Sequence, residues 1–325
     1  MIEMMSKGIP TIKNTITSDE LERSYQYCRE IVKQSGSNFY YGMWLTLNKK
    51  KRNALFAIYA WMRTIDDIAD SPLPNEEKIA QLNDFYQTTN VILETNPSIH
   101  HQHMNAQGDV QAMTTQELFW PAFRQTIMEY ALSPDYFKHM FLGQLQSVQQ
   151  NQYDTFDALY EYCYRVAASV GQICICIWGY KGGKSTLKMA EYRGVALQLT
   201  NIIRDFEKDR ANGVLFIPEE WMKNAQTSSH SQIHTLNTIE ANQMLQQLIT
   251  HAEYYYNESR DLERNISRIG SLSLRVMTKS YRLLLTKLRK NPQALGKNKD
   301  ISLNQFEKIS VCFVSFFQWC LRLNG

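Results

Sequence analysis

The stretch RTIDDIAD, residues 63–70, gathers acidic side chains within one helical turn. Asp66 and Asp70 are four residues apart and Asp67 lies between them, so on a helix they would share a face. The apolar run ALFAIYAWM at 54–62 precedes them, which indicates a helix that begins in a core. A buried helix that then presents clustered acids is best explained if a cation neutralises them.

A second stretch, NIIRDFEKD at 201–209, repeats this pattern. Asn201, Asp205 and Asp209 recur every four residues, and Gln198 extends the same stripe by nearly one turn. Like charges at this spacing destabilise a helix by about 0.2–0.5 kcal/mol. Either cluster alone is more typical of a solvated face, but two clusters on mostly apolar helices favour a binding site.

Oxygen ligands without histidine or cysteine suit Mg²⁺, which keeps several waters and binds substrate phosphates. Arg63 and Arg204 adjoin the acids, and a guanidinium can grip phosphate oxygens with two hydrogen bonds. An ordinary ion pair within the helix, such as Arg63 with Asp67, is the alternative. The two stripes therefore predict a site for a diphosphate and divalent metal ions.

The elements that must position these residues are helices. Apolar residues recur with helical periodicity, whereas the alternation typical of strands is hard to find. We expect helices near 19–34, 51–70, 76–94, 117–130, 134–151, 155–178, 185–209, 238–263 and 272–290. No internal repeat or dividing linker is evident. The pattern predicts one all-α domain over residues 1–325, with 1–18 as a flexible N-terminal segment.

Composition excludes some classes of function. The net charge of +3 over 325 residues is too small to indicate nucleic-acid binding, and no such motif is present. The six cysteines form no C-x-x-C pair, which favours free thiols in a reducing compartment. The N-terminus lacks an apolar run of signal-peptide length, so we expect a cytoplasmic protein.

The segment ISVCFVSFFQWCLRL at 309–323 has two interpretations. It is too short for a membrane span, and a terminal core helix is the favoured one. The alternative is an aromatic helix resting on a membrane surface, so peripheral membrane contact stays open.

Three stretches together resemble the squalene/phytoene synthase family, whose enzymes join two prenyl diphosphates head to head. They are RTIDDIAD, YCYRVAASVG at 162–171 and LQLTNIIRDFEKDRANGVLFIP at 197–218. The resemblance runs from about residue 36 to residue 288. It implies an all-α, single-domain helical bundle of the isoprenoid-synthase type with a central apolar cavity.

The resemblance also implies roles for individual residues. The aspartates of both motifs would be catalytic through metal binding, and Tyr162 would lie near the reacting carbons, unless it is only a core aromatic. The implied metal ligands are Asp66, Asp67, Asp70, Asn201, Asp205 and Asp209. The implied substrate-binding residues are Arg63, Arg204, Phe39, Gln198, Gly171, Gly194 and Tyr281.

The implied reaction is Mg²⁺-dependent condensation of two farnesyl diphosphates to presqualene diphosphate, with squalene as a further product if NADPH is used. NADPH use and oligomeric state stay open. One alternative is phytoene synthase, which uses geranylgeranyl diphosphate. Another is a non-catalytic assembly or binding relative. The sequence departs from the family near Lys297 and Lys299, where many members have an arginine.

Overall fold

The computed structural model describes residues 16–35, 42–94, 118–224, 238–290 and 301–321. The chain divides into two compact units. The first comprises residues 1–37 and 49–134, and the second comprises residues 38–48 and 135–325. The prediction of one domain over residues 1–325 stays a prediction.

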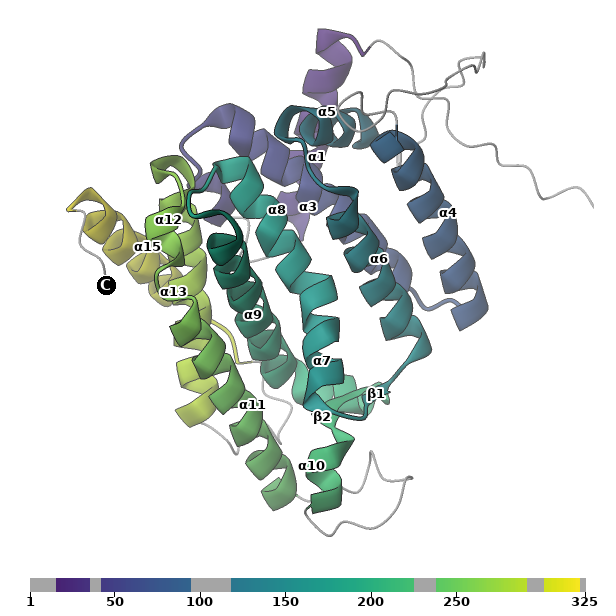
Figure 1. The fold of residues 1–325 in the computed structure, drawn as a ribbon, viewed down its shortest axis with the longest axis vertical. Helices are drawn as coiled ribbons and strands as arrows, with labels where there is room; N and C mark the ends of the chain where they lie inside the picture. The colour runs from purple at the N-terminus through teal and green to yellow at the C-terminus, as the bar shows by residue number, and fades with distance from the viewer. Residues whose placement is uncertain (1–15, 36–41, 95–117, 225–237, 291–300, 322–325) are drawn as a thin grey trace, which may run out of the picture. The chain divides into compact units, whose positions relative to one another are not determined.

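The first unit is built from helices (Figure 1). Its described helices are α1 (Ser18–Gln34), α3 (Lys49–Ala69), α4 (Asn75–Glu94) and α5 (Trp120–Tyr130). At the start of α1, the Thr17 side chain accepts from the Glu20 backbone N–H, and the Glu20 carboxylate accepts from the Thr17 backbone N–H. This capping box satisfies backbone donors that the first helical turn leaves unpaired.

An aromatic core holds the helices of the first unit together. The buried Trp61 ring of α3 stacks on Phe123 of α5, with ring centroids 5.7 Å apart. Its indole N–H donates to the Thr89 hydroxyl of α4 at 2.9 Å. A buried indole without such an acceptor would be costly, so this bond fixes how α3 and α4 pack.

The second unit is also helical, with one small exception. Its elements are α6 (Pro134–Gln149), β1 (Gln152–Tyr153), α7 (Phe156–Cys163), η2 (Tyr164–Ala168), α8 (Ser169–Trp178), α9 (Gly183–Ala211), β2 (Leu215–Pro218), α10 (Glu219–Asn224), α11 (Thr238–Glu258), α12 (Leu262–Asn265), α13 (Arg268–Lys290) and α15 (Gln305–Cys320). Strands β1 and β2 form a parallel pair, in which Gln152 lies opposite Leu215 and Tyr153 opposite Pro218. The sequence did not predict this pair, because two residues are too few to show alternation.

The long helix α9 lies at the centre of the second unit. It packs against α8, α11 and α13, and its buried side chains belong to the main hydrophobic core. Helices α7 and α8 are joined without a break by η2, a π-helical turn. A π-helical turn shifts the helical register and is frequent at functional sites.

The helical segments expected from the sequence are observed with ends shifted by a few residues. The segment expected at 155–178 contains the π-turn, and the one expected at 238–263 ends at Glu258, with α12 following as a short helix. The C-terminal α15 is not the core helix that was favoured, since most of its aromatic side chains are exposed. In the described residues, no helix is long and apolar enough to cross a membrane.

Candidate functional site

The first acidic cluster ends helix α3. The side chain of Asp66 is half-buried, whereas Asp67 and Asp70 are exposed. Asp70 follows the last helical residue, and its backbone N–H still donates to the Asp66 carbonyl at 2.8 Å. The segment 54–58 before the acids is fully buried, so the helix does begin in a core, as the sequence predicted.

Arg63 makes the alternative contact that the sequence allowed. Its Nη2 lies 2.6 Å from Oδ1 of Asp67, one turn away. Partial burial would lower the pKa of Arg63, but the Asp67 carboxylate overcomes this and raises it. Both side chains are about half exposed, at 44% and 55%. Such a pair contributes little to stability, so the structure leaves Arg63 accessible for another anion.

The second acidic stripe runs along α9. Gln198, Asn201, Asp205 and Asp209 are each half-buried. The intervening positions, including Leu199, Ile202, Ile203 and Phe206, are buried in the core of the second unit. The stripe therefore borders the core, and water reaches it only in part. An acidic surface of this kind differs from the solvated face that the sequence also allowed.

Asn201 carries an unsatisfied buried oxygen. Its amide nitrogen donates to Oε1 of Gln198 at 3.4 Å, but its Oδ1 is buried and has no hydrogen-bond partner. A buried carbonyl oxygen without a partner costs roughly 1–3 kcal/mol. A hard cation would satisfy this oxygen. The neighbouring side chains of the stripe, Asp205 and Asp209, offer carboxylate oxygens, which are also ligands for hard cations. The residues of this stripe therefore fit a Mg²⁺ ion.

Arg204, Asp205 and Tyr281 come together from two helices. The Arg204 guanidinium donates twice to Asp205, from Nε to Oδ1 at 2.8 Å and from Nη2 to Oδ2 at 2.6 Å. These hydrogen bonds, with a smaller contribution from one to Tyr281 of α13, raise the pKa of Arg204 although its burial opposes this. The structure thus joins three of the residues implied for the site.

In the described residues, no three or more His, Cys, Asp or Glu side chains gather as a metal site would require. The first stripe belongs to one compact unit and the second stripe to the other. The prediction that their acids share metal ions stays a prediction.

Tyr162 lies in an aromatic cluster. It is 7% exposed, and its ring stacks on Phe216 with centroids 5.3 Å apart. Tyr153 packs against both rings, and its own buried hydroxyl has no hydrogen-bond partner. The contacts match the core-aromatic alternative for Tyr162, while its implied position near reacting carbons stays a prediction.

The two implied glycines differ in their surroundings. A Cβ on Gly194 of α9 would lie 2.4 Å from the Ala168 Cα in the π-turn, so only glycine permits this helix approach. A Cβ on Gly171 of α8 would lie 3.4 Å from the Ala190 carbonyl oxygen, an ordinary contact. Gly194 therefore brings α9 onto η2, and a role for either glycine in prenyl binding stays a prediction. Phe39, Lys297 and Lys299 lie outside the described residues.

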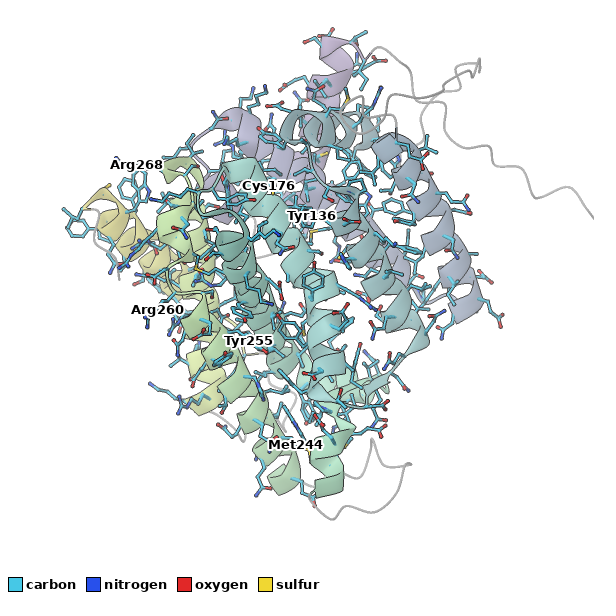
Figure 2. All side chains as sticks on the ribbon, viewed as in Figure 1. Tyr136, Cys176, Met244, Tyr255, Arg260 and Arg268 are labelled. Carbon is cyan, nitrogen blue, oxygen red and sulfur yellow. The ribbon has the colours of Figure 1, made fainter. Side chains whose placement is uncertain are left out.

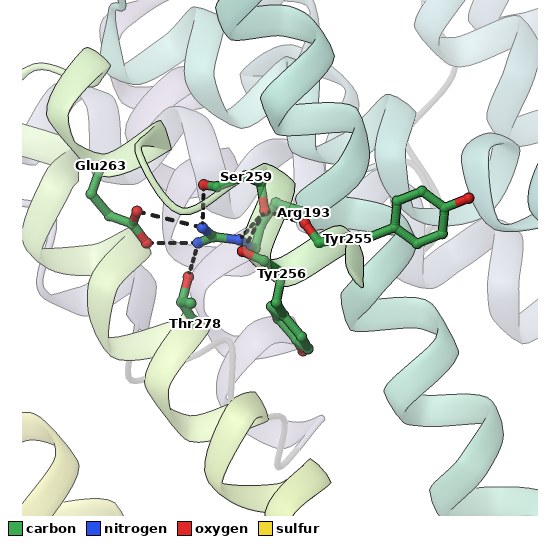
Figure 3. Close-up of polar contacts among 6 residues, drawn as sticks. All are labelled: Arg193, Tyr255, Tyr256, Ser259, Glu263 and Thr278. Carbon is green, nitrogen blue, oxygen red and sulfur yellow. Dashed lines mark hydrogen bonds and ion pairs between the residues drawn. The ribbon is translucent and has the colours of Figure 1, made fainter. Parts of the chain in front are cut away.

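A buried charge network, which the sequence analysis missed, anchors α9 on its other side (Figure 3). Arg193 donates to Glu263 Oε1 at 2.6 Å, to the Ser259 carbonyl at 2.6 Å and to the Thr278 hydroxyl. Arg193 is 3% exposed. Burial would raise the pKa of Glu263, but the Arg193 charge and its hydrogen bonds hold it below its ordinary value. The sequence feature that could have indicated this network is the position of Arg193 directly before the small and apolar residues 194–197.

Comparison with known proteins gives one family. The model of the squalene/phytoene synthase family matches residues 32–307. The 15-cis-phytoene synthase of Synechococcus elongatus is 30% identical over 211 residues, 62% of this chain and 62% of that protein. The phytoene synthase of Mycobacterium tuberculosis is 32% identical over 201 residues, 62% of this chain and 59% of that protein. The matches thus span less than two thirds of the length of these relatives.

Solved structures share the fold. A dehydrosqualene synthase in complex with ligand has a TM-score of 0.74 at 24% identity, covering 93% of this chain and 99% of that one. Squalene synthase HpnC from Alicyclobacillus acidocaldarius has a TM-score of 0.70 at 19% identity, covering 85% of this chain and 97% of that one. The predicted all-α fold of the isoprenoid-synthase type is confirmed.

Proposed function

This chain belongs to the squalene/phytoene synthase family, and from that premise we propose that it condenses two prenyl diphosphates head to head with release of diphosphate. The observation that carries the proposal is the half-buried oxygen stripe of α9, in which the Oδ1 of Asn201 has no hydrogen-bond partner. A scaffold protein gains nothing from this arrangement, because an unsatisfied oxygen and aligned acids only destabilise the helix.

The proposed metal is Mg²⁺, which Asn201, Asp205 and Asp209 of α9 would hold; the α3 acids Asp66, Asp67 and Asp70 are the other proposed ligands. When bound, it would neutralise the charge that develops on the departing diphosphate. The donors are all oxygens, as Mg²⁺ prefers.

Arg204 and Tyr281 supply the proposed diphosphate contacts on α9 and α13. The Arg204 guanidinium already donates through its Nε and Nη2 edge to an anionic group, the Asp205 carboxylate. A diphosphate offers a guanidinium more charge than one carboxylate does. We propose that substrate binding transfers Arg204 from Asp205 to phosphate oxygens, which frees Asp205 to bind metal. Arg63 would make the corresponding exchange on α3.

The chemistry follows from loss of diphosphate from the first substrate. The allylic cation left behind is attacked by the C2=C3 double bond of the second prenyl diphosphate. Transfer of one proton to an oxygen of the released diphosphate then closes a cyclopropane. Apolar walls must exclude water, which would quench the cation. The aromatic cluster of Tyr162, Tyr153 and the partly buried Phe216 provides a candidate wall of this kind.

Farnesyl diphosphate is the proposed substrate, with presqualene diphosphate as the first product. It is supported by the likeness of residues 37–43 and 162–180 to bacterial presqualene diphosphate synthases. Geranylgeranyl diphosphate is the second candidate, and the names of the curated relatives in Synechococcus elongatus and Mycobacterium tuberculosis favour it.

Product analysis tests the proposal. The chain is incubated with farnesyl or geranylgeranyl diphosphate, each with and without Mg²⁺ and with and without NADPH. We expect diphosphate release and a cyclopropyl product from farnesyl diphosphate only when Mg²⁺ is present. Turnover of geranylgeranyl diphosphate alone would establish the second candidate. If neither substrate reacts, the non-catalytic alternative is correct.

A further inference from the structure

The C-terminal helix α15 exposes an apolar stripe. Seven large apolar side chains of this segment are at least 43% exposed, and Phe306 and Phe313 reach 86% and 70%. The exposed set is Phe306, Ile309, Phe313, Val314, Phe316, Phe317 and Leu321. Most of these positions follow a helical repeat, so they form one continuous face. Single exposed apolar residues need no explanation, but a contiguous aromatic face marks an interaction surface.

Polar contacts hold α15 with this face outward. Its Glu307 carboxylate accepts from Lys287 of α13 at 2.9 Å, and its Gln318 side chain accepts from Lys279. Trp319 donates to Ser271 at 3.1 Å. The fully buried residue of the helix is Ser315. Val311, Cys312 and Trp319 are half-buried, so the helix turns a mixed polar and apolar side toward the protein while its phenylalanines face outward.

The helix α13, on which α15 packs, is strongly basic. Its residues 268–290 include seven Lys or Arg and no Asp or Glu. The four arginines follow one another at seven-residue spacing, so they run along one side of the helix. They are Arg268, Arg275, Arg282 and Arg289. Figure 2 labels Arg268 beside α15, where its guanidinium lies 4.6 Å from the centre of the Trp319 ring.

We propose that α15 and α13 together form a docking surface for an anionic lipid bilayer. The phenylalanine face of α15 enters the boundary between headgroups and acyl chains, while the exposed α13 side chains of Arg268, Arg282 and Lys290 meet anionic headgroups. An apolar face flanked by Lys and Arg is the combination that holds a helix in the plane of a membrane. The proposal adopts the second interpretation of residues 309–323, an aromatic helix that rests on a membrane surface.

A second copy of the chain is a poorer occupant. A symmetric contact through α15 would use the same patch on both copies. It would bring the basic α13 of each copy toward that of the other, and like charges at close range repel. An anionic bilayer instead complements the apolar and the basic halves of the surface.

Co-sedimentation with vesicles tests the proposal on the full chain without substrate, so the result does not depend on prenyl transfer. Vesicles contain phosphatidylcholine alone or phosphatidylcholine mixed with phosphatidylglycerol. We expect binding to the anionic vesicles that weakens as NaCl is raised, because salt screens the basic contribution. The variant Phe313→Glu/Phe317→Glu should bind at least about tenfold more weakly, since each buried phenylalanine contributes about that much.

Two further variants separate the contributions. Tyr254→Glu alters an aromatic residue of α11 that is 51% exposed, and it should bind like the unmodified chain. Arg282→Gln/Lys290→Gln should bind more weakly to anionic vesicles and show a smaller salt dependence. Equal binding of Phe313→Glu/Phe317→Glu and the unmodified chain would overturn the proposal. A second result would also overturn it: the unmodified chain binds no vesicles and is a dimer in analytical ultracentrifugation, and Phe313→Glu/Phe317→Glu is a monomer.

Discussion

At the scale of single residues, the carboxylate of Asp205 lies against the guanidinium of Arg204, at 2.6 and 2.8 Å. The Arg204 charge compensates part of the repulsion between Asp205 and Asp209. The exposed fractions of 30% and 35% leave both side chains within reach of a ligand. The pair therefore links the sequence pattern to the proposed chemistry.

Asp205→Asn should lower turnover of farnesyl diphosphate by at least about 100-fold, the scale of losing one group that stabilises transition-state charge. The isosteric amide keeps the helix, so circular dichroism should be unchanged. Lys208→Gln is the control, because Lys208 is exposed on the same helix. A rate like that of the unmodified chain would remove Asp205 from the metal site.

The ionisation of Glu263 makes the free energy of unfolding depend on pH in the acidic range. Its pKa in the folded chain lies below the ordinary value of 4.5. The stabilisation is therefore complete above about pH 4.5 and is lost as the pH falls through the lower folded pKa. The difference in unfolding free energy between the unmodified chain and Glu263→Gln should be constant from pH 6 to 7 and shrink below pH 4.5. Urea titrations at each pH measure it, and a difference that grows in acid would contradict the assignment.

At the scale of elements, the position of α9 is set by contacts on two sides. Gly194 permits its approach to the π-turn η2, and Arg193 ties it to α12, α13 and Ser259 in the turn after α11. Those two residues precede the oxygen stripe on the same helix. The register of α9 therefore decides where Asn201 and Asp205 lie.

Arg193→Met should lower the free energy of unfolding by about 3–5 kcal/mol, because it leaves the Glu263 carboxylate buried without its cation. Urea unfolding measures the loss. Arg264→Met is the matched control. It removes an ion pair to Asp261 whose side chains are 57% and 48% exposed, and it should cost less than about 1 kcal/mol. Equal losses for both variants would show that the network contributes no more than a surface pair.

Gly194→Ala and Gly171→Ala form a second pair. A methyl group at 194 would meet the Ala168 backbone at 2.4 Å and force α9 away from η2, at a cost of about 1–3 kcal/mol. A methyl group at 171 fits and raises helix propensity, so stability should be unchanged or higher by up to about 1 kcal/mol. Thermal unfolding distinguishes them. If Gly194→Ala is as stable as the unmodified chain, the backbone of η2 must shift to make room for the methyl group.

At the scale of the whole molecule, the proposed ligands come from α3 and from α9 and α13. These belong to the two compact units. A ligand that binds both sets of acids would add its binding free energy to the stability of the folded chain.

A non-reactive thio analogue of farnesyl diphosphate with Mg²⁺ should therefore raise the unfolding temperature. At a hundred times its dissociation constant the gain is about 2.7 kcal/mol, which corresponds to a rise on the order of 4 °C for a chain of this size. Mg²⁺ alone, or the analogue with a chelator, should have a smaller effect. Additive, independent effects would contradict a shared site. Differential scanning calorimetry measures all of these conditions.

The sequence by itself determined the helices and the oxygen stripes. Helical periodicity is local, so the apolar positions around Asn201 and Asp205 predicted both α9 and the face its polar residues occupy. The motif around RTIDDIAD and the motif of residues 197–218 likewise led to the family that the comparison confirmed.

Only the tertiary structure decided contacts between residues far apart in the chain. Arg193 and Glu263 are 70 positions apart, and no local pattern pairs them. The outward turn of α15 is also a tertiary result, because Glu307, Gln318 and Trp319 contact α13 and so fix which side of the helix faces the protein. Periodicity shows that a helix has two faces. Which face is buried depends on the neighbour that folding brings against it.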